Sequence, residues 1–156
     1  MTNAYFELLI ALVLGGIIGI ERSFAHKTAG LRTYALVSMG SCLLVIVGNL
    51  TLSNFIGYNA LDPQHFAASI IVGIGFLCGG VIIFQDKHLS GLTTAAGLWI
   101  SSAVGITVGY GFISLAIFAT LSTLLVLTVF WYFEHIITDK FQSREHDGQR
   151  TRAQKD

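Results

Sequence analysis

The fold is decided by the stretch LSGLTTAAGLWISSAVGITVGYGFISLAIFATLSTLLVLTVFWYF, residues 89–133, which carries no formal charge. It is long enough for two membrane-spanning helices, because one span takes about 20 apolar residues. Gly109-Tyr110-Gly111 lies near its middle and predicts a turn between the two helices. We therefore expect helices at Leu92–Val108 and Phe112–Glu134.

Three more apolar segments precede this stretch. They predict helices at Ala4–Ile20, Leu31–Leu52 and Gln64–Phe84. Asp62-Pro63 is a typical helix start, with Asp as the N-cap and Pro in the first turn. Polar loops, Glu21–Arg32 and Gln85–Ser90, separate the helices. The sequence thus predicts an all-α integral membrane protein with a five-helix transmembrane domain, 1–134, and a polar cytoplasmic tail, 135–156.

The composition supports a bilayer environment. Hydrophobic residues make up 53% of the chain and charged residues 12%, about half the ~25% of an average soluble domain. The mean hydropathy is +0.69. Because the formal net charge is zero, nucleic acid is not an expected partner.

The basic residues set the expected orientation. With five spans, all nine Lys and Arg fall on one side of the membrane: Arg22, Lys27, Arg32, Lys87, Lys140, Arg144, Arg150, Arg152 and Lys155. Basic loops face the cytoplasm in most membrane proteins. We therefore expect the N-terminus outside and the C-terminus inside.

Two helix pairs resemble each other. Gly15-Gly16-Ile17-Ile18 is followed by Gly30-Leu31-Arg32-Thr33, and Gly79-Gly80-Val81-Ile82 by Gly91-Leu92-Thr93-Thr94. One interpretation is a parallel repeat of helices 1–2 and 3–4 about an axis along the membrane normal. The other is chance similarity in a glycine-rich apolar chain.

Small residues recur at helical spacing. In lipid they let helix backbones approach closely, which supplies the attraction between helices. The predicted packing positions are Gly15, Gly19, Gly75, Gly79, Gly97, Ser101, Gly105 and Gly109. The spacing leaves open whether these residues pack within one chain or in a homo-oligomer.

Polar residues at the cytoplasmic helix ends form a candidate functional cluster: Glu21, Arg22, Arg32, Thr33, Asp86, Thr93 and Thr94. We expect an ion pair between Glu21 and Arg32, because the dipole at a helix start disfavours a cation. An anion bound near Arg32 is the alternative. Arg22 is expected to anchor the topology, and the threonines to be helix caps or ligands.

Other chemistry is not indicated. Glu7, the one acid within a span, either reaches the interface or marks a proton or cation site. The five histidines lack metal-ligand spacing, so we expect no metal. No cofactor is expected, and because the common nucleotide, hydrolase and zinc motifs are absent from the sequence, neither is an enzyme.

Four ordered motifs resemble the MgtC/SapB family of bacterial membrane proteins. They are GGIIGIER (15–22), AGLRT (29–33), GIGFL (73–77) with Gly80, and GLTTAA (91–96) with Trp99. The resemblance covers about residues 5–134. The chain departs from the family pattern at two places. Cys78-Gly79 stands where the family usually has Gly-Ala, and Tyr34 stands where it commonly has His. Longer members carry a soluble C-terminal domain, whereas here 22 residues follow the last predicted helix.

The resemblance implies a cytoplasmic (inner) membrane protein concerned with magnesium homeostasis, stress adaptation and virulence. Two function classes follow. The first is a regulatory factor that binds another membrane protein. The second is a small transporter or channel for Mg²⁺ or H⁺.

Overall fold

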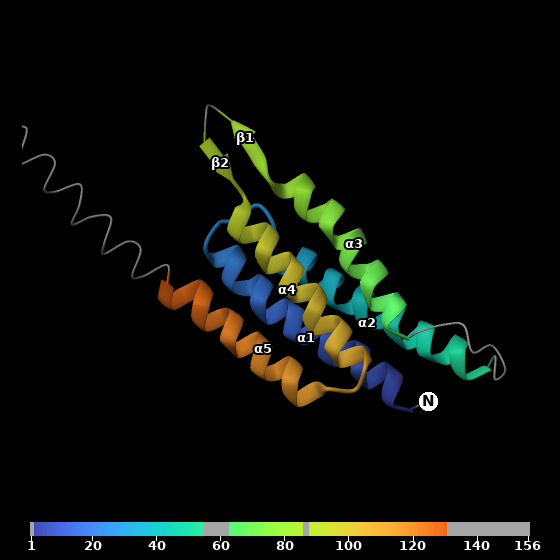
Figure 1. Cartoon of the computed structure of the whole chain (residues 1–156). Coiled ribbons are helices and arrows are strands. Elements are labelled where there is room, and N and C mark those ends of the chain that lie inside the picture. Colours follow the sequence, from blue (N-terminus) through green and yellow to red (C-terminus); the bar gives the residue numbers. More distant parts are fainter. Residues whose placement is uncertain (1, 55–62, 86–87, 131–156) are drawn as a thin grey trace, which may run out of the picture. The chain divides into compact units, whose positions relative to one another are not determined.

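The computed structural model describes residues 2–54, 63–85 and 88–130, and helices occupy most of them. Figure 1 shows α1 (Thr2–Phe24), α2 (Leu31–Asn54), α3 (Pro63–Val81), α4 (Leu92–Gly109) and α5 (Ile113–Leu125), which continues into a π-helix (Val126–Phe130). A short antiparallel hairpin, β1 (Ile83–Gln85) and β2 (His88–Ser90), lies between α3 and α4. The chain divides into two compact units, Met1–Thr123 and Leu124–Asp156, and residues 124–130 are the described part of the second.

The helices have the length and composition of membrane spans. Within the described residues, four apolar segments are long enough to cross a bilayer: Ala4–Phe24, Leu31–Leu52, Leu92–Gly109 and Ile113–Phe130. The apolar part of α3, His65–Val81, is shorter. The prediction of an all-α membrane protein is thus confirmed. The orientation stays a prediction, and the predicted boundary after residue 134 lies outside the described residues.

Helix starts agree with the prediction better than helix ends. α2, α3 and α4 begin at Leu31, Pro63 and Leu92, where the sequence suggests. The predicted end of the first helix at Ile20 is wrong, because α1 continues to Phe24.

The predicted end of the third helix at Phe84 is also wrong. α3 stops at Val81, and Phe84 pairs with Leu89 in the hairpin. Gly79 and Gly80 are poor helix formers, and the β-branched residues that follow them favour an extended backbone.

The predicted break after α4 is present as a tight turn. The Gly111 amide donates to the Val108 carbonyl over 2.8 Å, and the Phe112 amide donates to the Thr107 carbonyl over 3.0 Å. Gly111 has a φ of 82°, a left-handed conformation that suits glycine at a helix end. In α5, the buried residues are Ala116 and Thr120, and most other side chains are exposed.

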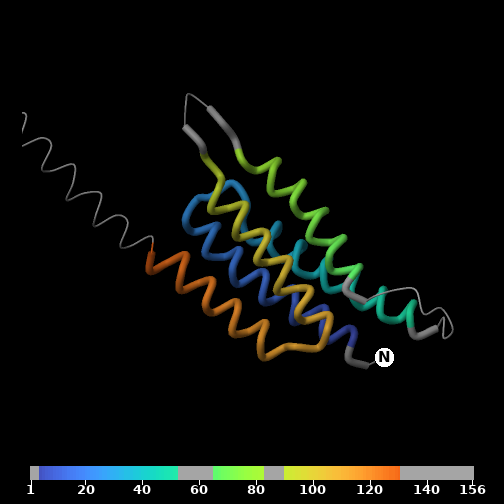
Figure 2. Tube along the Cα trace, in the orientation of Figure 1, coloured from blue at the N-terminus to red at the C-terminus, as the bar shows by residue number. Residues whose placement is uncertain are grey.

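Three helices, α1, α2 and α4, pack against one another and form the core of the first unit (Figure 2). α3 packs against α4 and α2, where Val45, Ile70, Ile74 and Ile106 form a buried cluster. The other face of α3 carries the exposed side chains Val72 and Phe76.

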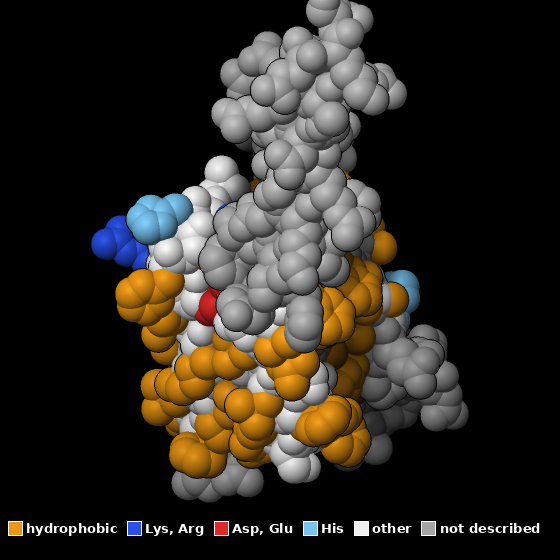
Figure 3. Space-filling view, turned by 90° about the vertical axis from the view of Figure 1, so that its left-hand side faces the viewer, with side chains coloured by type: hydrophobic (Ala, Val, Ile, Leu, Met, Phe, Trp, Pro, Cys, Tyr) orange, Lys and Arg blue, Asp and Glu red, His pale blue; other side chains and the backbone are white. Residues whose placement is uncertain are grey.

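The described outer surface is largely apolar. Figure 3 shows hydrophobic side chains covering much of one face, with the coloured acidic and basic atoms toward its upper part. Large side chains such as Phe6, Val72, Phe76 and Phe118 are at least 60% exposed. A soluble monomer rarely exposes an apolar surface of this extent, whereas lipid tails solvate it readily.

Candidate functional site

The turn between α1 and α2 is held by backbone hydrogen bonds. The Lys27 amide donates to the Arg22 carbonyl over 3.0 Å, and the His26 amide donates to the Ser23 carbonyl over 3.1 Å. His26 has a φ of 53°, in the position where such a helix end usually has glycine. This turn places Glu21 and Arg22 inside the last helical turns of α1 rather than in a loop.

Ser23 joins the two helices across this turn. Its hydroxyl donates to the Gly19 carbonyl over 3.1 Å and accepts the Leu31 amide over 2.9 Å. Gly30 packs directly against Ser23, so a side chain at position 30 would displace it. The first amide of α2 is thus capped by Ser23, a role that the sequence did not reveal. Thr33, predicted as a cap or ligand, is exposed.

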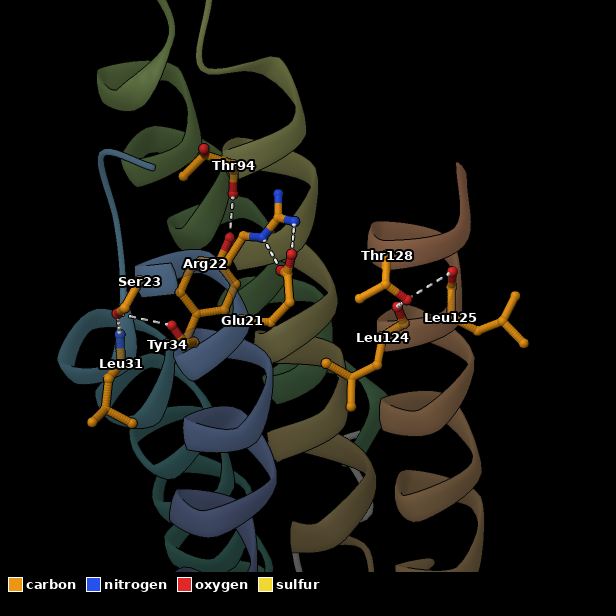
Figure 4. Close-up of polar contacts among 10 residues, drawn as sticks. Glu21, Arg22, Ser23, Leu31, Tyr34, Thr94, Leu124, Leu125 and Thr128 are labelled. Carbon is orange, nitrogen blue, oxygen red and sulfur yellow. Dashed lines mark hydrogen bonds and ion pairs between the residues drawn. The ribbon is translucent and has the colours of Figure 1, made fainter. Parts of the chain in front are cut away.

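Glu21 pairs with its neighbour Arg22. The Nε and Nη2 atoms of Arg22 both donate to the Glu21 carboxylate, and the Nη2–Oε1 distance is 2.6 Å (Figure 4). Arg22 is 3% exposed and Glu21 is 19% exposed. A guanidinium that is almost fully buried needs such a partner, because an unpaired buried charge is costly.

The predicted Glu21–Arg32 ion pair is therefore wrong. Arg32 is exposed, whereas the Glu21 carboxylate binds Arg22. The physical reason is that α1 stays helical through both residues, which puts Arg22 within reach of the carboxylate. Asp86, predicted as a second acid at this end, lies outside the described residues.

Tyr34 connects α2 to α4 just inside this pair. Its side chain is fully buried, and its hydroxyl donates to the Thr94 carbonyl over 3.0 Å (Figure 4). A Cβ atom on Gly97 would come within 3.1 Å of the ring, and one on Gly19 within 2.9 Å of the Tyr34 Cβ. Both glycines thus make room for the tyrosine, a partner that their spacing alone did not identify.

Serine hydroxyls continue this polar contact deeper between α2 and α4. Ser101 donates to the Tyr34 carbonyl over 2.9 Å, and the Ser41 and Ser102 hydroxyls are 2.8 Å apart. The Ser38 hydroxyl is fully buried and has no hydrogen-bond partner within the described chain. Of these serines, the sequence predicted a role only for Ser101.

Glycines in α1 and α4 bring the three core helices together. A Cβ atom on Gly15 would lie 2.5 Å from the Ser38 Cβ, and one on Gly109 would lie 2.9 Å from the Cys42 carbonyl oxygen. A Cβ on Gly105 would meet the Ser38 backbone, 2.7 Å from its carbonyl carbon and closer still to its oxygen. α2 thus packs against the glycines of both neighbours.

Two predicted packing positions meet no neighbour within the described chain, so packing at these positions stays a prediction. Within the described chain, no atom lies within 4 Å of a Cβ placed on Gly75 or Gly79. The same holds for Gly80, whereas Gly15 and Gly16, the counterparts of Gly79 and Gly80 in the proposed repeat, do meet α2. The two helix pairs therefore differ in packing, because α3 turns these glycines away from its neighbours.

Other candidate residues remain separate from the cluster. Glu7 is half-buried and Thr93 is exposed. No group of three or more metal-ligating His, Cys, Asp or Glu side chains occurs within the ranges that the structure describes. In the second unit, the Thr128 hydroxyl donates to the Leu124 carbonyl of its own helix over 2.7 Å (Figure 4).

An apolar groove of about 810 Å³ lies between α2 and α3. Its walls include Gly40, Gly48, Phe66, Ser69 and Gly73. The hydroxyls along it, on Ser41, Thr51 and Ser69, donate to carbonyls of their own helices. The groove therefore presents hydrocarbon to whatever fills it.

These features define a multi-pass α-helical membrane protein with a glycine-packed core and a charged pair at one end. The family model described as "MgtC family" matches residues 8–136, and the chain belongs to this family. No solved structure matches it.

Three curated relatives illustrate the similarity. The chain is 37% identical to "Putative magnesium transporter YhiD" of Escherichia coli (strain K12), over 93% of the chain and 66% of the relative. It is 35% identical to an uncharacterized protein of Haemophilus influenzae, over 90% and 60%. It is 43% identical to "Protein MgtC" of Brucella abortus (strain 2308), over 74% and 46%. The chain thus spans between about half and two thirds of the length of these relatives.

Proposed function

We propose that this protein is a regulatory factor of magnesium homeostasis, stress adaptation and virulence in the bacterial cytoplasmic (inner) membrane. It acts by contact with another membrane protein and catalyses no reaction. The name of the Escherichia coli relative, "Putative magnesium transporter YhiD", supports the connection with magnesium, and membership of the MgtC family supports the family's wider role.

The observation that carries this proposal is the closed core. At the glycines of α1 and α4, these helices pack directly against the backbone of α2. Glu21 neutralises the charge of Arg22 at one end of this three-helix core. Mg²⁺ keeps several waters and needs a wide path lined by oxygen ligands. Backbones this close leave little room for a hydrated ion between these helices, which favours contact over conduction.

The surface that we assign to the partner is the outer face of α3. Gly75 and Gly79 are one helical turn apart on α3, and most residues next to them in the sequence are exposed. Small residues at this spacing allow a second transmembrane helix to approach closely. The test is Gly75→Leu, with Ala96→Leu, an exposed small residue on α4, as the matched control.

The experiment compares growth at low magnesium with flux. Cells that depend on the protein should grow with the Ala96→Leu variant and fail with Gly75→Leu, at equal membrane abundance and equal helix content. Purified protein in liposomes should show no Mg²⁺ entry above protein-free liposomes. Equal growth of both variants would refute the α3 contact, and Mg²⁺ entry would refute the regulatory role.

A transporter for Mg²⁺ or H⁺ is the second candidate. The name of the Escherichia coli relative favours it, and so does the charged pair at the end of the core. The flux measurement above decides between the two.

A further inference from the structure

Arg22 has a donor that its ion pair does not use. Nε and Nη2 bind Glu21, which leaves Nη1 without a hydrogen-bond partner among the described residues. The side chain is 97% buried. Within the described chain, Ser38 Oγ is the one fully buried side-chain donor or acceptor that lacks a partner. Arg22 Nη1 is therefore not fully buried and keeps some solvent-accessible surface. Figure 4 shows this third nitrogen pointing away from Glu21, toward the end of the core where Thr94 lies. Glu21 thus holds Arg22 in place while one of its nitrogens stays available.

Thr94 offers a second unused group at the same end. The residue is 2% exposed, and its hydroxyl has no hydrogen-bond partner in the described part of the chain. Like Arg22 Nη1, the hydroxyl keeps some solvent-accessible surface. Its carbonyl oxygen accepts the Tyr34 hydroxyl, which fixes the first turn of α4 against α2. A threonine hydroxyl that binds no group of the described chain and keeps some accessible surface is free to donate to a ligand at this end of the core.

The first turn of α4 adds backbone donors. Gly91 precedes the helix in a left-handed conformation, and within the described residues no side chain caps this turn. At the equivalent end of α2, the first amide is already bound by Ser23. Thr93, the second residue of α4, is exposed, which places the start of α4 at the surface of the protein.

We propose that this end of the core binds a phosphate group between Arg22 Nη1, the Thr94 hydroxyl and the first amides of α4. A helix start favours anions through its free amides and its dipole. Guanidinium groups bind phosphate oxygens through short, charge-assisted hydrogen bonds. Because the Glu21 charge cancels that of Arg22, the dipole of α4 and the exposed Lys27 in the adjacent turn supply the remaining positive potential.

The phosphate has two chemical sources at this depth. The site lies where spans end, which is the level of phospholipid head groups. A soluble phosphate compound can also reach it from the aqueous side. The two sources share the same recognition chemistry, and they differ in whether the phosphate is attached to acyl chains. The proposal does not depend on whether the protein regulates or transports.

The experiment uses delipidated full-length protein in detergent micelles. Phosphatidylglycerol binding is measured by native mass spectrometry, and inorganic phosphate binding by calorimetry at constant ionic strength. The wild type should bind at least one probe. Thr94→Val, which keeps the side-chain volume, should weaken that binding about three- to tenfold through loss of one hydroxyl. Arg22→Lys should weaken it about tenfold or more, because a lysine cannot keep the fork on Glu21 and a free donor together.

Arg32→Gln is the matched control, since Arg32 is an exposed arginine at the same end of the core. It should change the affinity less than twofold. Binding of phosphatidylglycerol alone assigns the site to a lipid head group, and binding of inorganic phosphate assigns it to a soluble compound. Binding of neither probe overturns the proposal. So does a Thr94→Val protein, folded by circular dichroism, that binds as tightly as the wild type, or an Arg32→Gln protein weakened as much as Thr94→Val.

Discussion

Replacing Gly105 by Ala should separate α4 from α2. The added Cβ would lie 2.7 Å from the Ser38 carbonyl carbon, about 0.7 Å inside the ordinary contact distance of 3.4 Å, and closer still to the carbonyl oxygen. The obstructing atoms belong to a helix backbone, so a side-chain rotation cannot relieve the clash. The two helices must move apart.

The loss of stability can be worked out from the contacts at this interface. Overpacking costs about 1–3 kcal/mol. Separation also strains the hydrogen bonds that Tyr34, Ser101 and Ser102 make between α2 and α4, worth about 0.6 kcal/mol each in a membrane. Against this, Ala is a better helix former than Gly by about 1 kcal/mol. We expect a net loss of about 2–4 kcal/mol.

The assay is maleimide labelling of Cys42 in a Cys78→Ala background. Cys42 is fully buried on α2 and is a free thiol, so it reacts only when the core opens. When opening and closing are faster than labelling, the expected loss raises the labelling rate about 30- to 700-fold, since 1.4 kcal/mol is a factor of ten.

Gly75→Ala is the control for helix propensity, because no described atom lies near its Cβ position. It should leave labelling unchanged or slow it. If Gly105→Ala labels at the rate of Gly75→Ala, the α2–α4 backbone contact is not a stabilising contact and the reasoning fails.

Three further predictions concern the charged end of the core and the topology. Glu21→Ala should cost about 2–3 kcal/mol in detergent melting, below the about 3–5 kcal/mol of a fully desolvated pair, whereas Arg32→Ala should stay within about 0.5 kcal/mol; equal losses would contradict the observed pairing. Tyr34→Phe should cost about 0.5–1.5 kcal/mol for one lost hydrogen bond with the ring retained, and an unchanged melting temperature would argue against the contact with α4. In intact cells, an impermeant maleimide should label Phe112→Cys but not Thr28→Cys, and the reverse pattern would invert the topology.

The helix content of this protein is readable from its sequence because lipid leaves few choices. Every backbone amide and carbonyl inside the bilayer must be satisfied, so a long uncharged stretch has to be helical. For this reason residues 89–133 predicted two helices and the turn at Gly111 between them. The same argument fails at helix ends, where water satisfies the backbone. At these ends, α1 continues beyond the predicted Ile20, and α3 ends at Val81, where a hairpin follows.

The glycine spacing predicted packing but could not select the partners. Gly105 and Gly75 occupy similar sequence patterns, yet one meets the Ser38 backbone and the other meets no described atom. Spacing tells which residues share a face of one helix. Which face turns inward depends on every other helix at once.

Charge pairing shows the same division. The sequence alone determined that Glu21, Arg22 and Arg32 lie near one end of the membrane part, because charged groups stay close to the interface. Only the tertiary structure decided that Glu21 binds Arg22, that Arg32 faces outward, and that Tyr34 locks Thr94 beside them. The physical reason is that hydropathy fixes depth in the bilayer, whereas a pairing within 3 Å depends on where each helix ends and how it is rotated about its axis.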